Sequence, residues 1–456
     1  MDPTLLNPSR RQLLKTAGCG FGSLALSAMA NQTPVIAPRA KRVIFLFMQG
    51  GPSQVDTYDY KPELFKADQR EVGFYVPRTR VEEQRTVMKP MWDFKQYGES
   101  GRWSSSLFPE VAKHVDDLCF IHSMHTEGVA HGPATLFLHT GATNLVRPSM
   151  GAWISYGLGS ENENLPAFVT VNPPANKGGP RNYANAFLPA FHQGTVLGQP
   201  GNPNANPEIR NLNSPLSDQS IKREHDFLEE LNQMQVADST DSVLDGLIKS
   251  HELAWRMQTH ASELVDVDRE SRETQELYGI GNDTTDGFAR QCLAARQLAE
   301  SGVRFIQISH CDNAATPVWD QHNNMPKHEQ LAGEVDKPIA GLLEDLKRRG
   351  LLEDTLVWWG AEFGRTPFSQ NNNGRDHNPR GFTVWLAGGG VNPGTSIGAT
   401  DEFGFQAVEN KVHMHDLHAT ILHALGLDHE QLTYRFAGRD FRLTDVHGRV
   451  VEEVFA

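Results

Sequence analysis

Acidic and imidazole side chains recur just after short apolar segments of this sequence. Carboxylate and imidazole groups are the ligands that zinc, manganese and magnesium use in proteins, whereas copper thiolate and iron–sulfur centres need cysteine. Carboxylates that gather in one place repel each other unless a cation compensates them. We therefore predict a divalent metal site, with zinc as the first candidate and manganese, magnesium or calcium as alternatives. The predicted ligands are Asp56, Asp320, His322, Glu362, Asp376 and His377.

The apolar segments themselves predict the fold. They run almost without polar residues, which is typical of strands that are covered on both faces of a parallel sheet. Helical patterns lie between them, so the chain is predicted to be a layered α/β protein with a mostly parallel central sheet and helices on both faces. Ligand sites form at the carboxyl ends of such strands, so the predicted ligands should meet at one edge. The predicted strands are residues 42–47, 118–121, 167–171, 303–308, 355–359 and 382–386, and the clearest helices are 287–301, 329–349 and 416–425.

Residues 172–280 interrupt the strand–helix alternation. The first part, to about residue 218, is rich in Asn, Pro and Gly, and residues 220–278 have the pattern of long helices with polar faces. We interpret this block as a loop and helix insertion over one rim of the sheet, within a single domain that spans residues 31–456. It is either a lid over the site or a surface excursion with no role in it.

Residues 1–30 have the features of an export signal. The pair Arg10-Arg11 precedes an apolar run, rich in Gly and Ala, that begins near Thr16 and ends in the small-x-small sequence at residues 28–30. This order is typical of a twin-arginine signal, and we predict cleavage after Ala30. The apolar run is too short and too rich in glycine for a membrane-spanning helix. We expect a periplasmic or secreted protein without a stable membrane anchor.

The net charge and the cysteine content limit which partners and which disulfides are expected. The 456 residues carry a formal net charge of −14, which argues against a nucleic-acid partner. Only Cys119, Cys292 and Cys311 lie beyond the predicted signal, so at most one disulfide is expected. No Cys-x-x-Cys pair occurs, which disfavours a thiolate zinc site. The oligomeric state is left open.

Five motifs resemble a known family. They are Gly-Gly-Pro-Ser-Gln-Val-Asp-Thr-Tyr-Asp at 50–59, Trp-Asp-Gln-His-Asn-Asn at 319–324, Glu-Phe-Gly-Arg-Thr-Pro at 362–367, Asp-His-Asn-Pro at 376–379 and the tail from Arg435 to Val446. Together with the signal, they resemble the secreted, sulfatase-like family of domain of unknown function 1501. The order of elements is similar to the wider alkaline-phosphatase-like superfamily, which includes phosphatases, sulfatases and cofactor-independent phosphoglycerate mutases. The resemblance covers nearly the whole chain after the signal.

The superfamily resemblance implies a reaction. The sequence Phe-Ile-Gln at 305–307, followed by Asp320 and His322, matches one ligand segment of the superfamily, and Glu362 and His377 match two more ligand positions. These transfers imply two neighbouring cations that clamp a phosphate or sulfate group. The resemblance therefore implies an exported, metal-dependent hydrolase of phosphate or sulfate esters, with a small-molecule or glycan ester as substrate.

Two ligand positions depart from the superfamily pattern. Gln49 stands where the superfamily has an Asp ligand at the end of its first strand, and Asp56, or less well Asp59, could replace it. Phe363 stands where the Asp-His pair of the superfamily has its histidine.

The position of the nucleophile is the third departure. That residue lies ten positions before the glycine of a Thr-Gly pair in the superfamily, and ten positions before Gly141 this chain has His131. His131 is a nucleophile, or a metal ligand or base that directs a water, or a substitution in a site that no longer catalyses. Arg365 is predicted either to hold a tetrahedral anion or to lock the rim through a carboxylate.

Two other functions compete with the hydrolase. One is a non-catalytic relative of the same fold that binds an anionic or glycan ligand, and the other is a mutase or transferase acting on a phosphorylated metabolite. The histidine-rich run from His413 to His418 is better explained by Asp416 capping the helix that follows than by metal binding.

Overall fold

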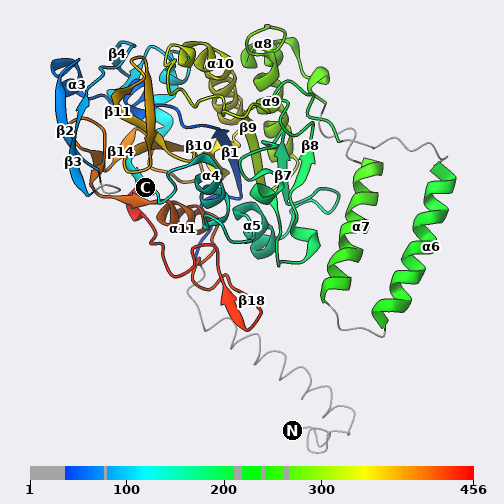
Figure 1. Ribbon diagram of the computed structural model, residues 1–456. Helices are drawn as coiled ribbons and strands as arrows, with labels where there is room; N and C mark the ends of the chain where they lie inside the picture. Colours follow the sequence, from blue (N-terminus) through cyan, green and yellow to red (C-terminus); the bar gives the residue numbers. More distant parts are fainter. Residues whose placement is uncertain (1–35, 77–79, 210–217, 238–241, 261–265) are drawn as a thin grey trace, which may run out of the picture. The chain divides into compact units, whose positions relative to one another are not determined.

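The computed structural model describes residues 36–76, 80–209, 218–237, 242–260 and 266–456, and Figure 1 traces their path. The export signal that we predict for residues 1–30 lies outside these residues. Residues 38–456 form one compact unit around a central sheet. No helix in the described part of the chain is both long and apolar enough to span a membrane.

The central sheet of the described chain has nine strands in the order β14-β6-β13-β10-β1-β9-β7-β8, with β17 also paired to β6. All six strands predicted from the sequence are present, and most of the pairs are parallel. The predicted fold class, a layered α/β protein with a mostly parallel sheet, is confirmed. The strands are β1 (Arg42–Met48), β6 (Leu118–His125), β7 (Phe168–Val171), β8 (Thr195–Leu197), β9 (Phe305–His310), β10 (Thr355–Gly360), β13 (Phe382–Ala387), β14 (Thr395–Ile397) and β17 (Val412–His413).

Strand β13 is the exception to the parallel pattern. It runs antiparallel to both of its neighbours, β10 and β6. A parallel neighbour needs a crossover long enough for a helix, whereas the chain between β10 and β13 forms a hairpin of two strands, β11 (Gly364–Gln370) and β12 (Gly374–Asn378). The hairpin returns the chain from the carboxyl edge of β10, so β13 must run back the other way.

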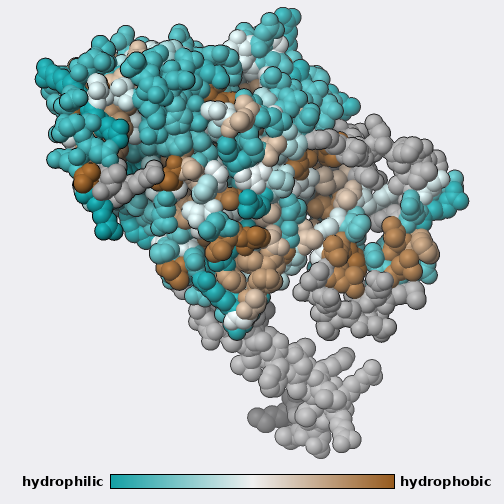
Figure 2. Space-filling view, viewed as in Figure 1, coloured by the Kyte–Doolittle hydropathy of each residue, from teal (hydrophilic) through white to brown (hydrophobic). Residues whose placement is uncertain are grey.

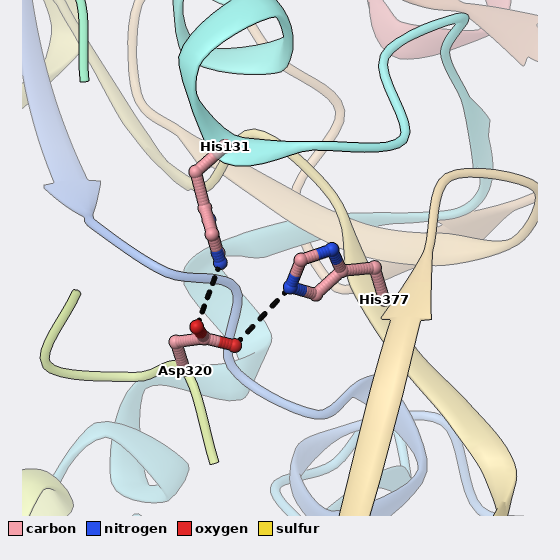
Figure 3. A group of neighbouring side chains, drawn as sticks. All are labelled: His131, Asp320 and His377. Atoms are coloured by element: carbon pink, nitrogen blue, oxygen red, sulfur yellow. Dashed lines mark hydrogen bonds and ion pairs between the residues drawn. The ribbon is translucent and has the colours of Figure 1, made fainter. Parts of the chain in front are cut away.

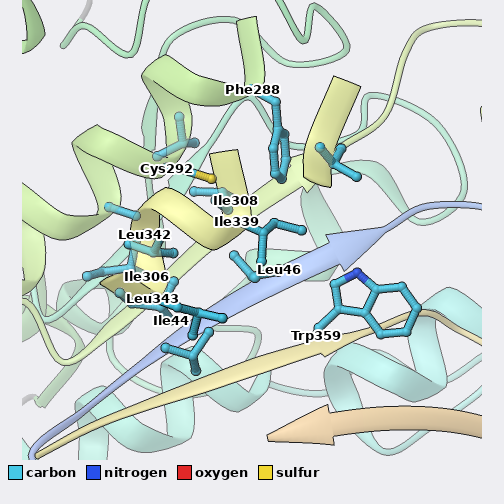
Figure 4. Packing of buried hydrophobic residues seen from close by; sticks show 14 of the residues in the cluster. Ile44, Leu46, Phe288, Cys292, Ile306, Ile308, Ile339, Leu342, Leu343 and Trp359 are labelled. Carbon is cyan, nitrogen blue, oxygen red and sulfur yellow. The ribbon is translucent and has the colours of Figure 1, made fainter. Parts of the chain in front are cut away.

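Helices cover both faces of the sheet, as predicted (Figure 1). Helices α9 (Asp286–Glu300) and α10 (Lys327–Arg348) pack on one face, and α4 (His131–Thr140), α5 (Met150–Leu158) and α11 (Met414–Ala424) pack on the other. Strand β1 lies between the two helical layers, and its alternate side chains point into one layer and then the other. Its Ile44 and Leu46 join the α9–α10 core seen in Figure 4, and Phe45 and Phe47 join the α4–α5–α11 core.

The block 172–280 contributes more than loops and helices. Its β8 pairs in parallel with β7 and so forms an edge of the central sheet. Helices α6 (Asp218–Ala237), α7 (Ser242–His260) and α8 (Arg272–Tyr278) follow, as the polar helical pattern predicts. Hydrophobic side chains are exposed on α6 and α7 (Figure 2), among them Phe227, Leu228, Leu231 and Leu247. Whether the block acts as a lid stays a prediction.

The three described cysteines, Cys119, Cys292 and Cys311, are buried and free. Cys119 and Cys292 lie within the two hydrophobic layers and Cys311 lies just after β9, and burial raises the pKa of each thiol. A buried thiol of raised pKa is inert, which agrees with a packing role.

His418 lies where α11 packs against α4, and it is buried in its neutral form. His418 donates from Nε2 to the carbonyl of Leu138 at 2.8 Å, and burial lowers the pKa of His418 to about 3. The capping box at the start of α11, formed by His413 and Asp416, confirms the structural explanation of this histidine-rich run.

We predict an acid-sensitive stability from His418. Its folded-state pKa lies below the unfolded value of about 6.5, so its contribution is complete above that pH and is lost as the pH falls towards 3. At pH 5 the loss from His418 should be about 2 kcal/mol, and His418→Gln should remove that part of the pH dependence in urea unfolding. The exposed His251→Gln is the control; an equal pH dependence in His418→Gln and wild type would contradict the assignment.

Candidate metal centre

Four segments bring the predicted site residues together at the carboxyl edge of the sheet. His131 is the first residue of α4, Asp320 and His322 lie in the loop after β9, and His377 lies on β12. Glu362 lies two residues after the end of β10. Figure 3 shows the Asp320 carboxylate between the rings of His131 and His377. The structure thus gathers most of the predicted residues, although they are spread over nearly 250 positions of sequence.

The Asp320 carboxylate is the centre of the cluster. Its Oδ2 lies 3.1 Å from Nε2 of His131, and its Oδ1 lies 2.9 Å from Nε2 of His322 and 3.2 Å from Nε2 of His377. The Asp320 side chain is only 7% exposed, so water screens these contacts weakly.

Each imidazole is fixed through its other nitrogen. Nδ1 of His131 donates to Glu362 Oε1 at 2.6 Å, and Nδ1 of His377 donates to the carbonyl of Val129 at 2.9 Å. Nδ1 of His322 contacts Gln370 Oε1. A ring that donates from Nδ1 presents the lone pair of Nε2, unless it carries a second proton. When the rings carry one proton each, all three turn an Nε2 acceptor towards Asp320.

Lone pairs that face each other repel unless something positive lies between them. The Nε2 atoms of His322 and His377 are only 3.0 Å apart, so they can share one proton but cannot both be protonated. A metal ion relieves the same repulsion, and metal-bound histidines commonly donate their second ring nitrogen to a carboxylate or carbonyl. Two groups of ligand atoms are close enough together to hold an ion, His131–Asp320–His377 and His322–Asp376–His377, and both include His377.

Without a cation, the same contacts move the pKa values towards ion pairing. Burial lowers the pKa of His131, but hydrogen bonds to Asp320 and Glu362 outweigh burial and raise it. The hydrogen bond to Asp320 also raises the pKa of His322. Burial raises the pKa of Asp320, yet the histidine hydrogen bonds and the Arg365 charge bring it far below its usual range. Asp320 is therefore stabilised as a carboxylate, because the histidines and Arg365 compensate its negative charge.

Glu362 supports His131 from behind. Besides His131, its carboxylate accepts from the backbone N–H of Gly50, at 3.0 and 3.1 Å for the two oxygens. Glu362 is fully buried and belongs to neither of the two metal groups. Its geometry is that of a residue that orients a ligand.

The glycine turn after β1 makes this contact. Gly50 and Gly51 have φ values of +111° and +80°, which other residues rarely adopt. A Cβ at Gly50 would also lie 2.8 Å from the backbone nitrogen of Asp320. The turn therefore needs glycine both for its conformation and for the close approach of the Asp320 loop.

Arg365 is enclosed beneath the same turn. Its Nη1 lies 2.7 Å from Asp320 Oδ1, its Nε donates to the carbonyl of Gly51 at 3.0 Å, and its Nη2 donates to the carbonyl of Gly50. The side chain has no exposed surface. Of the two predicted roles, this geometry fits the locking of the rim through a carboxylate and not the holding of a substrate anion.

Asp56 lies in another environment. Its Oδ2 forms an ion pair with Nε of Arg375 at 2.7 Å and accepts from Ser53 Oγ at 2.5 Å, and its Oδ1 accepts from the backbone of Met91. Both Asp56 and Arg375 are fully buried. The ion pair occupies the carboxylate that we predicted as a ligand, and Asp56 is in neither metal group.

The two other residues of this segment also have partners. Asp59 pairs with Lys61 at 3.1 Å, and Gln49 donates to Asn176 Oδ1 at 3.2 Å. Asp376, in contrast, lies at the rim of the site. Its side chain is 49% exposed, and its Oδ1 is 3.7 Å from Nδ1 of His322.

Sequence reasoning missed the residues that orient the histidines. Gln370 and the carbonyl of Val129 hold His322 and His377. Gln370 lies outside the family motifs, and a carbonyl leaves no trace in the side-chain pattern. Arg375 could have been found, since it directly precedes the predicted pair Asp376 and His377.

A comparison with protein families matches nearly the whole chain. The profile of the family described as "Protein of unknown function (DUF1501)" matches residues 40–455. No curated protein matches the sequence.

Several solved structures are similar to this chain at low sequence identity. A sulfatase from Pseudoalteromonas sp. is 13% identical, with 93% of this chain and 73% of that chain covered and a TM-score of 0.38. A phosphonate monoester hydrolase from Silicibacter pomeroyi is 13% identical, with coverages of 84% and 73% and a TM-score of 0.37. Alkaline phosphatase from the Antarctic bacterium TAB5 is 12% identical, with coverages of 85% and 98% and a TM-score of 0.35.

We predict that Asp56→Asn lowers the free energy of unfolding by about 3–5 kcal/mol, because it leaves the Arg375 charge buried without its partner. Urea unfolding followed by circular dichroism measures this. The matched control is Asp117→Asn, which breaks the more exposed pair with Lys347 and should cost less than about 1 kcal/mol. A similarly small effect at Asp56 would contradict the structural role.

Proposed function

Because the chain belongs to the DUF1501 family and carries this histidine–carboxylate cluster, we propose that it is a metal-dependent hydrolase of phosphate or sulfate esters. The observation that carries the proposal is the convergence of the Nε2 atoms of His131, His322 and His377 on the Asp320 carboxylate. Each of the two candidate ligand groups has two imidazoles and one carboxylate, a set that favours zinc over calcium or magnesium, which prefer oxygen ligands.

His131 acts as a ligand in this proposal. Its Nδ1 is bound to Glu362, so only Nε2 is available, and Nε2 points at Asp320. Of the three readings that the sequence leaves open, a metal ligand needs no rearrangement of these contacts. A nucleophilic His131 would have to turn Nε2 away from Asp320.

Arg365 and Glu362 keep the ligands of the proposed metal site in position. A bound divalent ion would supply a Lewis acid and lower the pKa of a coordinated water. Arg365 holds Asp320, and Glu362 holds His131, so that the ligands stay in place without a large rearrangement. Asp376 is the exposed carboxylate at the rim, and it is the carboxylate of the second ligand group, with His322 and His377.

The substrate class rests on the motif resemblance. The alkaline-phosphatase-like superfamily acts on phosphate and sulfate esters, and the segments around Asp320, Glu362 and His377 match its ligand segments. A small-molecule or glycan ester outside the cytoplasm fits the twin-arginine signal proposed for residues 1–30.

We predict that the mature protein, purified and dialysed against zinc-containing buffer, retains zinc by elemental analysis and hydrolyses an aryl phosphate or aryl sulfate. Asp320→Ala and His377→Ala should lose both metal and turnover, because each removes an atom from the same ligand group. Asp312→Asn, in the same loop but outside both groups, is the matched control and should keep both. Wild-type protein that holds zinc and binds a glycan without turnover would favour the non-catalytic alternative.

His131→Ala separates its possible roles. Loss of zinc together with turnover is the result expected for a ligand. Loss of turnover with full zinc content would make His131 a chemical group and contradict our assignment.

We predict that Glu362→Gln weakens zinc binding about 10- to 100-fold but leaves the stoichiometry unchanged, since Glu362 orients His131 without belonging to a ligand group. Isothermal titration calorimetry against a competing chelator gives both quantities. A reduced number of bound ions at saturation would instead identify Glu362 as a ligand.

A further inference from the structure

Three hydrogen-bonded side chains lie behind the loop that carries Asp320. Residues 311–326, all of which the structure describes, connect β9 to α10 and form no helix or strand. Trp319, the residue before Asp320, is fully buried. Its indole Nε1–H donates to Nδ1 of His310 at 2.9 Å, and Nε2 of His310 lies 2.8 Å from Oε2 of Glu334 on α10.

The chemistry of these three groups fixes which atoms donate and which accept. An indole N–H can only donate, so Nδ1 of His310 is the acceptor, and the ring carries its proton on Nε2. Nε2 therefore donates to Glu334. Burial raises the pKa of Glu334, but the hydrogen bond from His310 brings it below its usual value, so Glu334 accepts as a carboxylate. The His310 side chain is only 5% exposed, so water competes weakly for either bond.

A second imidazole packs against the same indole. The rings of Trp319 and His328 meet edge to face, with their centroids 5.0 Å apart. His328 has no exposed surface, and its Nε2 accepts from the backbone N–H of Ser53 at 3.3 Å. Burial lowers the pKa of His328, so this ring is neutral. Packing thus encloses the indole, and the hydrogen bond to His310 sets the direction of its N–H.

The position of Trp319 determines the position of Asp320. Consecutive Cα atoms are about 3.8 Å apart, so a shift of one residue moves its neighbour. The backbone N–H of Trp319 donates to the carbonyl of Gln49 at 3.1 Å, and a Cβ on Gly50 would lie 3.0 Å from the same nitrogen. The loop is therefore packed closely against the glycine turn. Arg365 holds the Asp320 carboxylate itself, whereas Trp319 holds the backbone that carries it.

We propose that His310 is a positioning residue of the metal centre, which holds the Trp319 indole and, through it, the Asp320 backbone at the place where the carboxylate meets the histidine nitrogens. This role rests on the proposed function, since it concerns zinc binding at the same centre. His310 is not a ligand, because its two ring nitrogens bond to Trp319 and Glu334. Ligands must be held to within about 0.5 Å, so a loop without helix or strand needs a side-chain anchor of this kind.

Two substitutions of His310 separate its two hydrogen bonds. His310→Asn places Oδ1 near the position of Nδ1 and can still accept from Trp319, whereas His310→Gln places its amide near the position of Nε2 and can still donate to Glu334. Each variant loses one buried hydrogen bond, so both should lower the midpoint of urea unfolding. Only His310→Gln should weaken zinc binding, by about 10-fold, as is typical of residues that orient a ligand. His310→Asn should bind zinc as wild type does.

Two measurements on the purified protein distinguish the variants. Competition with a chelator gives the zinc affinity. The indole N–H resonance of Trp319 in a proton–nitrogen correlation spectrum of the metal-free protein shows whether its hydrogen bond persists, and Trp319→Phe identifies that resonance among those of the eight tryptophans. We expect the resonance to move in His310→Gln and to stay in place in His310→Asn. The control is His429→Gln, at another buried histidine, which should lower the unfolding midpoint without changing the zinc affinity.

Equal zinc affinities in folded His310→Asn and His310→Gln would overturn the positioning role, and so would affinities that follow the unfolding midpoint. If neither variant folds, Trp319→Phe removes the indole N–H and should weaken zinc binding by the same factor; an unchanged affinity there would also overturn the role. These results leave the metal centre intact. Wild-type protein that binds no zinc would instead overturn the proposed metal centre and this role together.

Discussion

Repulsion between the lone pairs of neighbouring imidazole and carboxylate groups is the main constraint at this edge of the sheet. Three imidazole nitrogens face the Asp320 carboxylate within about 3 Å, and two of them, those of His322 and His377, also face each other. Such an arrangement is stable only with positive charge among the acceptors. Glu362, the Val129 carbonyl and Gln370 hold the Nδ1 sides of the rings, so the rings cannot relieve the repulsion by turning over.

The surrounding chain makes this geometry rigid. Arg365 is buried under the Gly50–Gly51 turn and bonds to both Asp320 and the turn, so it joins the end of β1 to the loop after β9. The buried pair of Asp56 and Arg375 fixes the β11–β12 hairpin, which carries His377, to the segment after β1. Breaking either ion pair leaves a buried charge, and this ties the position of the ligands to the stability of the fold.

The sequence predicted the architecture where one local signal was sufficient. Uninterrupted apolar runs gave the six predicted strands, and the three predicted helices correspond to α9, α10 and α11. The antiparallel direction of β13 could not be read in this way, because it depends on the β11–β12 hairpin, which replaces a crossover helix. The edge strand β8 has only three residues and gives no periodic signal.

The site was predictable as a set of residues but not as a set of roles. A carboxylate next to a strand end can bind a metal, orient a histidine or pair with an arginine, and the sequence does not separate these roles. Asp320, Glu362 and Asp56 follow strand ends in the same way, yet they form the cluster centre, a support for His131 and a buried ion pair. Tertiary partners such as Arg375 and Gln370 decide between them.

X-ray absorption spectroscopy at the zinc edge of the zinc-loaded protein identifies the atoms bound to the metal. We expect a first shell that contains imidazole nitrogen at about 2.0–2.1 Å, with the multiple scattering typical of histidine rings and at least one carboxylate oxygen. Asp320→Ala should lose this signal. A shell of oxygen alone, or the same spectrum in wild type and Asp320→Ala, would contradict the proposed zinc site.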